Sequence, residues 1–367
     1  MKASFLTENL QKKLSFLNHA VSNVNQLEIL SFFLIVAEKG KIKISATDLE
    51  IGISSEFSAN IEDEGRVCVP AKTFLDLINN ISEEKITIET EGQNLVVKGK
   101  KIRMVFQTTP ADDFPKLYDE KGEEEATFEK EGAVIDLGKV VFAASTDNSR
   151  PDLSGVLIKK SKGKVLMVAT DGYRLSLKES SLIKTRDKEG EELLLSARAI
   201  RELMSLKEED INLYLSKKSN QAIFVAGETT LAGRLIEAKY PSYEKIIPDG
   251  FETKTEFDRE EMQKAVKICS VFARETANIV KISVKKDKII ISANTPSVGE
   301  NTVEIDAKVS GEENEIAFNA RYLLDLFSNV GEELMSFEMT GPLNPGVFKI
   351  TGDGSFLHLI MPIRVQG

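Results

Sequence analysis

The sequence predicts an α+β protein made of three tandem repeats of one domain-sized unit. Its 367 residues exceed what a single hydrophobic core usually organises, so two or three domains are expected. Two local patterns each recur three times, at intervals of 123 to 126 residues. Repeats of that length are far longer than those of solenoid proteins, so each repeat is expected to be an αβ domain of its own.

The first recurring pattern is a short apolar strand followed by a turn residue, an alanine, a basic residue and a helix. Its alanines are Ala71, Ala197 and Ala320. The second pattern is a strand with an alanine near its end. Those alanines are Ala46, Ala169 and Ala293. Both patterns therefore divide the chain into the same three parts.

Each repeat is expected to open with a helix that has one apolar face. In the first repeat this face follows the polar start 7–9 and comprises Leu10, Leu14, Leu17 and Val21. In the third it follows Phe257 and Asp258 and comprises Met262, Ala265, Val266 and Cys269. The middle repeat has a weaker pattern over 136–146. Alternating apolar and polar residues predict strands over 41–53, 85–91 and 281–291.

Two segments have the composition of linkers between domains. One is the acidic stretch 121–125, and the other is the Pro-Asp-Gly sequence at 248–250. Solvated segments poor in core residues are typical of domain boundaries. The sequence therefore predicts domains over 1–124, 125–249 and 250–367.

The overall composition is that of a folded protein, with 41% apolar and 29% charged residues. The N-terminus has no apolar signal segment, and no run of uncharged apolar residues reaches membrane-spanning length, so a cytoplasmic protein is expected. Cys68 and Cys269 are expected to be buried thiols. The net charge of −10 repels nucleic acid at long range, but the local distribution of Lys and Arg decides whether DNA can bind.

The sequence offers few groups for catalysis. Its only histidines, His19 and His358, have no neighbouring arrangement that suggests a triad or a metal site, and no phosphate-binding or dinucleotide motif occurs. Asp48 and Asp171 each follow Ala-Thr and could be proposed as paired carboxylates. A structural role is favoured, because Thr-Asp at the end of a strand can bond the backbone of the next turn. The sequence predicts no catalytic residue, no metal and no cofactor.

Three segments carry a resemblance to a known family. Residues 169–175 read Ala-Thr-Asp-Gly-Tyr-Arg-Leu, residues 240–248 read Tyr-Pro-Ser-Tyr-Glu-Lys-Ile-Ile-Pro, and residues 359–365 read Leu-Ile-Met-Pro-Ile-Arg-Val. In this order, and in a chain of this length, they resemble the bacterial DNA polymerase III beta subunit. The similarity spans the whole chain.

The resemblance implies a non-catalytic processivity factor that encircles and slides on double-stranded DNA without sequence preference. Two three-domain subunits would form a head-to-tail ring, lined by helices and with its sheets outside. Such a heterologous contact stays finite only if the rotation closes. The implied partners are the alpha subunit of DNA polymerase III, the clamp loader, and other polymerases and repair proteins that carry a clamp-binding motif.

The DNA-facing residues are expected on helix starts and one loop. Lys72, Arg198 and Arg321 share one repeat position in the first helical turn, where the helix dipole disfavours a positive charge. They either face the hole and meet phosphates or are three ordinary surface bases. The resemblance adds the loop residues Asn148 and Arg150. The resemblance also places further bases of the helices toward the hole, where they could supply a diffuse positive lining: Lys12, Lys13, Lys139, Arg201, Arg259, Lys264 and Lys267.

One loop departs from the family. Where members often have Arg-Pro after the first helix, this sequence has Val24 and Asn25, and Glu28 stands where proline is common. A DNA contact by this loop is therefore left open.

The resemblance also implies a groove for short linear motifs of partner proteins. One half comprises Leu153, Thr170, Gly172, Tyr173, Arg174, Leu175, Pro241, Lys245, Ile246, Ile360 and Met361. The other half comprises Asn319, Tyr322, Pro345, Pro362, Ile363 and Arg364. Leu175, Ile246, Ile360 and Met361 are expected to accept apolar anchor residues of a partner. Lys245 stands where the family often has arginine, so the planar guanidinium with its two parallel donors is missing at that position. The alternative is that the terminal strand 356–363 only completes a sheet.

The dimer contact is expected to pair the first domain with the third. Met104 and Phe106 would meet Val271 and Phe272, with Lys101 and Arg103 near Glu300 and Glu304.

Two other functions stay open from sequence alone. One is a multidomain enzyme with a site between repeats, and the other is a clamp paralogue that serves resistance or regulation.

Overall fold

Three helices begin at the alanine that the repeats share, as predicted. They are α2 (Ala71–Asn79), α4 (Ala197–Met204) and α6 (Ala320–Asn329). In each, the alanine and the apolar residues at helical spacing are buried, so one face packs on a sheet. The helices that open the repeats are α1 (Thr7–Leu17), α3 (Lys130–Val141) and α5 (Arg259–Ala273). In α5 the expected stripe of Met262, Ala265, Val266 and Cys269 is at most 1% exposed.

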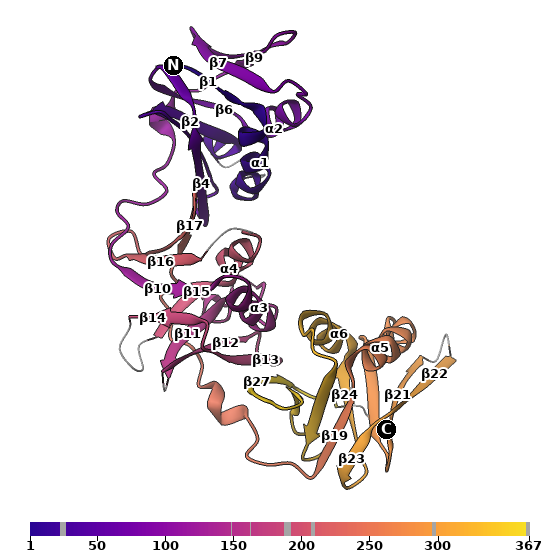
Figure 1. Cartoon of the computed structure of the whole chain (residues 1–367). Coiled ribbons are helices and arrows are strands. Elements are labelled where there is room, and N and C mark those ends of the chain that lie inside the picture. The colour runs from indigo at the N-terminus through magenta and orange to yellow at the C-terminus, as the bar shows by residue number, and fades with distance from the viewer. Residues whose placement is uncertain are drawn as a thin grey trace. The chain divides into compact units, whose positions relative to one another are not determined.

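The computed structural model describes residues 1–22, 27–147, 149–161, 163–186, 192–206, 210–295 and 299–364. Its contacts divide the chain into two compact units. The first contains 1–130 and 205–235, and the second contains 131–204 and 236–367. Figure 1 labels the elements of both units.

The first unit contains two antiparallel arrays of strands, ordered β5-β1-β7-β8-β9 and β10-β16-β17-β18-β4-β3-β2-β6. Helices α1 and α2 lie side by side here (Figure 1). Its strands are β1 (Lys2–Leu6), β2 (Phe32–Glu38), β3 (Lys41–Thr47), β4 (Ile51–Ser58), β5 (Asn60–Asp63), β6 (Gly65–Pro70), β7 (Lys85–Glu91), β8 (Asn94–Lys98), β9 (Arg103–Gln107), β10 (Glu124–Phe128), β16 (Ile211–Ser216), β17 (Gln221–Ala226) and β18 (Thr229–Arg234). Its 3-10 helices are η1 (Asn18–Ala20), η2 (Glu28–Ser31) and η3 (Ala111–Asp113).

The second unit contains sheets ordered β15-β11-β12-β13-β27-β26-β25-β19-β23 and β22-β21-β20-β24. Helices α5 and α6 lie side by side, and α5 packs on β21 and β22 (Figure 1). The strands are β11 (Gly155–Ser161), β12 (Lys164–Thr170), β13 (Arg174–Ser180), β14 (Ile183–Thr185), β15 (Glu192–Ser196), β19 (Thr253–Asp258), β20 (Ile279–Val284), β21 (Lys288–Thr295), β22 (Gly299–Asp306), β23 (Lys308–Gly311), β24 (Asn314–Asn319), β25 (Leu334–Met339), β26 (Gly346–Ile350) and β27 (Asp353–Ile360). Its 3-10 helices are η4 (Pro151–Leu153) and η5 (Tyr243–Ile246).

Several predicted element bounds were wrong. The helix expected over 136–146 is α3, which starts at Lys130 and ends at Val141. The strand expected over 41–53 is two strands, β3 and β4, and the strand over 281–291 is β20 and β21. A tight turn reverses the chain in each case, and alternation of apolar residues continues through such a turn without marking it. The strand over 85–91 is confirmed as β7.

The Thr-Asp pairs are structural, as favoured from the sequence. Thr170 Oγ1 donates to the Arg174 carbonyl at 2.6 Å, and Asp171 Oδ1 accepts from the N–H groups of Tyr173 and Arg174 at 2.9 and 3.0 Å. In the third repeat, Thr295 Oγ1 instead donates to the Phe272 carbonyl.

Both cysteines are buried free thiols, as expected. Burial raises the pKa of Cys68 to about 12 and that of Cys269 to about 11, so neither is a thiolate at neutral pH. Among the described residues, no helix is long and apolar enough to cross a membrane.

Candidate functional site

The C-terminal tail runs between the turn at 170–174 and strand β24. Strand β27 pairs with β13, and the next residue, Met361, donates its N–H to the Tyr173 carbonyl at 2.8 Å. Two residues further on, the Ile363 N–H donates to the Ala317 carbonyl at 2.8 Å. These bonds bring the tail beside segments that lie nearly 200 residues and about 50 residues earlier in the sequence. The two predicted halves of the partner groove therefore meet at the tail.

The turn at 170–174 depends on glycine. Gly172 has φ +91°, a conformation that side chains with a Cβ rarely adopt. A Cβ at this position would also lie 3.2 Å from Arg150 Nη1 and 3.8 Å from Leu153 Cδ1. Glycine thus lets Arg150 and Leu153 approach the turn. The neighbouring Tyr173 side chain points into solvent and is 63% exposed.

A cluster of buried residues forms the floor beside this turn. Its members include Leu175, Tyr240, Tyr243, Val347 and Leu359. The Tyr240 hydroxyl donates to the Val168 carbonyl at 3.2 Å. Burial raises the pKa of both tyrosines, that of Tyr243 to about 12, so both hydroxyls stay neutral and the floor is uncharged.

The expectation for Ile360 was wrong. Ile360 is fully buried and belongs to the core around α5 and α6, whereas its neighbour Leu359 packs in the floor beside Leu175. Successive side chains of a strand point to opposite faces, so only one of two neighbours can face the groove. Sequence reasoning missed Leu359, although the alternation along 356–360 was the signal that could have found it.

Only some of the expected apolar residues are accessible to a partner. Leu153 and Leu175 are at most 1% exposed and cannot accept an anchor directly, which corrects the expectation for Leu175. The accessible apolar surface comes from Tyr173, Ile246 at 43% and Met361 at 37% exposure. Thr170 is buried as well, and Pro241 and Lys245 are exposed.

The Arg174 side chain connects three segments of this site. Its Nε donates to Asp171 at 3.0 Å, Nη1 to Asp325 at 2.6 Å and Nη2 to the Phe142 carbonyl at 3.0 Å. Its guanidinium carbon also lies 4.7 Å from the centre of the Tyr322 ring. With 9% exposure and bonds in three directions, Arg174 fixes the turn against α3 and α6 and has little surface left for a ligand.

His358 and Arg174 both contact the Phe142 ring. His358 is fully buried, its Nδ1 lies 2.6 Å from Ser176 Oγ, and its ring stacks on Phe142 at 5.2 Å. Burial, with a smaller effect of the Arg174 charge, lowers the pKa of His358 to about 3. The ring is therefore neutral at physiological pH.

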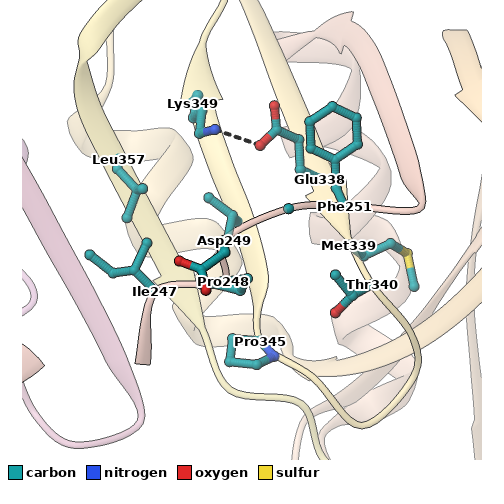
Figure 2. Close-up of a pocket in the computed structure, with 12 residues that line it drawn as sticks. Ile247, Pro248, Asp249, Phe251, Glu338, Met339, Thr340, Pro345, Lys349 and Leu357 are labelled. Carbon is teal, nitrogen blue, oxygen red and sulfur yellow. Dashed lines mark hydrogen bonds and ion pairs between the residues drawn. The ribbon is translucent and has the colours of Figure 1, made fainter. Parts of the chain in front are cut away.

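Two hollows adjoin the tail and the second linker. The hollow in Figure 2, about 140 Å³, lies between the linker 247–251 and strands β25, β26 and β27, and Pro345 lines it. Its Glu338 is buried and ion-paired with Lys349, as the dashed line shows. The other hollow, about 330 Å³, is lined by Pro342, Leu343, Ile363 and Arg364 among others.

The bases at the shared helix position are not equivalent. Lys72 and Arg321 are exposed at the second residue of α2 and α6, whereas Arg198 in α4 is half-buried. Asn319 caps α6, since its Oδ1 accepts from the Arg321 N–H at 3.0 Å. Arg150 is exposed beside Gly172, and Asn148 lies outside the described residues, as do Val24 and Asn25. Glu28 begins η2.

Two of the bases expected in the diffuse lining, Lys139 and Arg259, are largely buried, so the expectation was wrong for them. Lys139 is 6% exposed and ion-paired with Glu332. The Arg259 side chain is 13% exposed, with bonds to the carbonyls of Phe327 and Glu332 at 3.1 Å. Residues chosen only for being basic and on a helix include some that face the core side. Lys12, Lys264 and Lys267 are exposed, Lys13 pairs with Glu228, and Arg201 reaches the Val141 carbonyl.

Strands β9 and β22 are terminal strands of their sheets. Lys101 and Arg103 are exposed at β9, and Glu300 and Glu304 are exposed on β22. Of the apolar residues expected there, Val271 is 54% exposed and Met104 and Phe272 are half-buried. Phe106 is only 5% exposed and packs edge-on against Phe74, so little of its side chain is left for the contact with Val271 and Phe272 that was expected. The exposed apolar residue of β9 is Val105, at 50%.

Within the described part of the chain, no group of three or more His, Cys, Asp or Glu residues is arranged to hold a metal ion.

Comparison with known proteins gives consistent matches along the chain. Models of the DNA polymerase III beta subunit match in succession, the N-terminal domain over 1–118, the central domain over 133–242 and the C-terminal domain over 244–364. The beta sliding clamp of Staphylococcus aureus is 28% identical over 360 residues, covering 94% of each chain. That of Synechocystis is 27% identical over 390 residues, covering 100% of each.

Solved structures agree with this. The DNA polymerase III beta subunit of Thermotoga maritima superposes with a TM-score of 0.90, and the DNA polymerase sliding clamp of Bacillus subtilis with 0.92. Both are 25% identical to this chain, with 100% of each chain covered. Because domain models of one subunit match nearly the whole chain in order, the chain belongs to the family of bacterial DNA polymerase III beta subunits, the beta sliding clamps.

Proposed function

We propose that this chain is a DNA polymerase processivity factor, a homodimeric ring that encircles duplex DNA and tethers the replicative polymerase and other partners. It acts as a non-catalytic accessory subunit, in the cytoplasm where bacterial DNA is replicated. The observation that carries the proposal is the meeting of the tail with the turn at 170–174. It leaves Tyr173, Ile246 and Met361 exposed over an apolar floor.

The groove at this meeting point takes an extended segment of a partner protein. Exposed aromatic, aliphatic and methionine side chains are suited to bind apolar anchors, and Met361 can adapt its shape to different partners. Asn319, Tyr322, Pro362, Ile363 and Arg364 form the far side of the groove, with Lys245 at its rim. The solved sliding clamp of Bartonella birtlesii is bound to griselimycin, and one of Pseudomonas aeruginosa is bound to a ligand, so related chains do hold small molecules.

The ring closes by pairing β9 of one chain with β22 of its partner. A strand at the edge of a sheet has unpaired backbone groups that can accept another strand. The charges of the two strands are opposite, since Arg103 lies on β9 and Lys101 just before it, and Glu300 and Glu304 lie on β22. Such complementarity fixes the register of the pairing. The head-to-tail pairing repeats identically at both junctions of a dimer.

DNA passes through the ring and meets bases on the helices that line it. Lys72, Arg198 and Arg321 contact phosphates, with Arg150 and Asn148 from a loop. Phosphate contacts carry no base information, so the ring can slide on any sequence. The domains in this arrangement are 1–124, 125–249 and 250–367, and the order and lengths of the three matching family models support that division.

The experiment that tests the ring compares closed and open DNA. After loading, the protein should persist on a nicked circle and slide off the same DNA once it has been cut to a linear form. Retention is topological for a ring, so it requires a path without ends. Equal lifetimes on the two substrates, measured by gel filtration of the loaded DNA, would contradict the proposal.

A further inference from the structure

The turn between β3 and β4 repeats the turn of the partner groove bond for bond. Thr47 Oγ1 donates to the Ile51 carbonyl at 2.8 Å, and Asp48 Oδ1 accepts from the N–H groups of Glu50 and Ile51, both at 3.0 Å. Leu49 has φ +73°, at the position where the groove turn has a glycine. Three side chain to backbone bonds and a left-handed residue are thus the same in both turns.

In both places a neighbouring strand pairs with the strand that leaves the turn, β27 with β13 and β18 with β4, and its end bonds to the turn in the same way. In the groove, Met361 donates its N–H to the Tyr173 carbonyl at 2.8 Å. At the first turn, Arg234 at the end of β18 donates its N–H to the Glu50 carbonyl at 3.4 Å. Arg234 therefore occupies the position of Met361, and Glu50 that of Tyr173.

The register of the sheets adds a fourth position. Gln221 pairs with Arg234 in the β17–β18 ladder, and Pro345 precedes the β26 residue that pairs with Ile360. The groove positions Gly172, Tyr173, Pro345 and Met361 thus correspond to Leu49, Glu50, Gln221 and Arg234.

All four corresponding residues line one cavity of about 250 Å³ in the first unit. Residues 116–119, which precede the first linker and are called the linker segment here, also line it, and the Leu117 carbonyl accepts a bond of 2.8 Å from Gln221 Nε2. A cavity of about 150 Å³ can hold a benzene ring, so this one has room for a side chain and part of the backbone beside it.

The chemistry of this cavity differs from that of the groove. Where the groove exposes Tyr173 and Met361, the cavity exposes Glu50 and Arg234, and the linker segment adds Lys116. Neither Arg234 nor Lys116 forms an ion pair with any described residue, whereas the Asp119 carboxylate lies 4.0 Å from Lys218 Nζ. Two carboxylates, Glu50 and Asp119, and two bases, Arg234 and Lys116, line the cavity, and the two bases are the charges there that have no ion-pair partner among the described residues.

We propose that this cavity is a second binding site of the clamp, for an extended segment of a partner protein whose anchor residue is acidic. The arrangement of turn and strands that holds an apolar anchor residue in the groove would hold an acidic residue here, with its carboxylate between Arg234 and Lys116. Leu49 and Leu117 would contact the aliphatic residues next to that acidic residue in the peptide. The site is separate from the partner groove and does not depend on it.

A peptide fits this cavity better than a nucleic acid. A nucleic acid carries a phosphate at every residue, so some of its charges would meet Glu50 and Asp119, whereas a peptide can present a single carboxylate to Arg234 and Lys116 and uncharged residues on either side of it. The exposed Leu49 side chain, at 42%, offers contact to an aliphatic residue and nothing to a phosphate.

The test uses the full-length chain and a labelled probe, the capped peptide Ac-Leu-Glu-Leu-Glu-Leu-amide, with the same peptide carrying Gln for Glu as its control. Binding is measured by fluorescence anisotropy at low and at high salt. The double variant R234Q/K116Q should weaken binding of the acidic probe at least tenfold, because it removes both charge-assisted hydrogen bonds to the carboxylate of the probe. The variant K85Q removes a positive charge from an exposed residue of the same unit that does not line the cavity, and it should leave the affinity unchanged.

Three results would overturn the site. They are equal binding of the acidic probe and its Gln control, no loss of affinity in R234Q/K116Q, or displacement of the probe by a short single-stranded oligonucleotide. A polymerase-derived groove peptide should not compete with the probe. If the proposed groove were wrong, that peptide would fail to bind while the acidic probe still bound, so the two proposals fail separately.

Discussion

At the residue scale, the site depends on a few side chains whose roles the contacts assign. Arg174 belonged to the expected partner contacts, yet its three donor directions are used within the chain and its surface is nearly covered. Gly172 and Tyr173 beside it are exposed. A buried residue thus holds the turn in place, and its exposed neighbours are left for the partner.

Replacing Gly172 by Ala should reduce both stability and partner binding. The residue has φ +91°, and an alanine there is strained by about 1–2 kcal/mol, with a further close contact to Arg150. Urea unfolding followed by circular dichroism measures the first effect, and titration of a polymerase-derived peptide measures the second.

Gly250→Ala is the matched control. Gly250 has no positive φ, and a Cβ there meets nothing within 4 Å. This variant should leave the unfolding midpoint unchanged or raise it slightly, because alanine restricts the unfolded chain. A loss of stability as large as that of Gly172→Ala would contradict the role given to the left-handed turn.

His358 should make the protein less stable in mild acid. Its folded pKa of about 3 lies below the ordinary value, so between these values the unfolded chain binds the proton and the folded chain does not. Stability from this group is complete above the ordinary pKa and falls as pH decreases. At pH 5 the loss amounts to about 2 kcal/mol. His358→Gln, which cannot titrate, should flatten the dependence of the unfolding free energy between pH 6.5 and pH 5. An unchanged slope would show that other groups cause it.

At the element scale, the proposed assembly depends on strands at the edges of sheets and not on helices. Strands β9 and β22 end their sheets with charges of opposite sign. The charges have partners within the chain, as Arg103 lies 3.1 Å from Glu91 and Glu304 lies 2.7 Å from Lys288. These exposed pairs contribute little and can rearrange when two chains meet.

A charge swap tests the pairing of these edges. Arg103→Glu or Glu304→Arg alone should raise the dissociation constant of the dimer about tenfold, because each places like charges across the contact. The two changes combined should restore much of the affinity, as measured by analytical ultracentrifugation. Lys164→Glu, which changes an exposed and ion-paired base on β12 and not on β9 or β22, is the control. Additive losses in the double variant would argue against direct contact.

At the scale of the whole molecule, the proposed partner groove and the proposed dimer contact lie in different parts of the chain. The groove depends on the tail and the turn at 170–174, whereas the proposed dimer contact depends on β9 and β22. The two functions should therefore be separable by mutation.

Deleting residues 361–367 should weaken a polymerase-derived peptide by at least about 2 kcal/mol, the scale of an interface hot spot. The dimer mass should stay unchanged, because the deletion begins after β27 ends at Ile360. Calorimetry measures the peptide, and sedimentation measures the mass. A folded, dimeric truncated protein that binds the peptide with unchanged affinity would place the groove elsewhere.

The sequence alone determined the repeats and the start of the second helix in each repeat. A helix begins at Ala71, Ala197 and Ala320. The sequence predicts these helices because the pattern of strand, turn, alanine, base and apolar face lies within one short segment. The Thr-Asp turns were also accessible from sequence, because their bonds join residues two to four apart. The family resemblance added the candidate groove positions.

Tertiary structure alone decided which of those positions are accessible. Leu359 and Ile360 are adjacent and both apolar, but strand pairing sends one to the groove floor and the other to a separate core. Arg174 and Phe106 are a charged and an aromatic residue that composition cannot distinguish from surface residues, yet packing from distant segments buries both. Exposure depends on contacts made between residues far apart in sequence, and a local pattern does not determine which distant segment covers a given side chain.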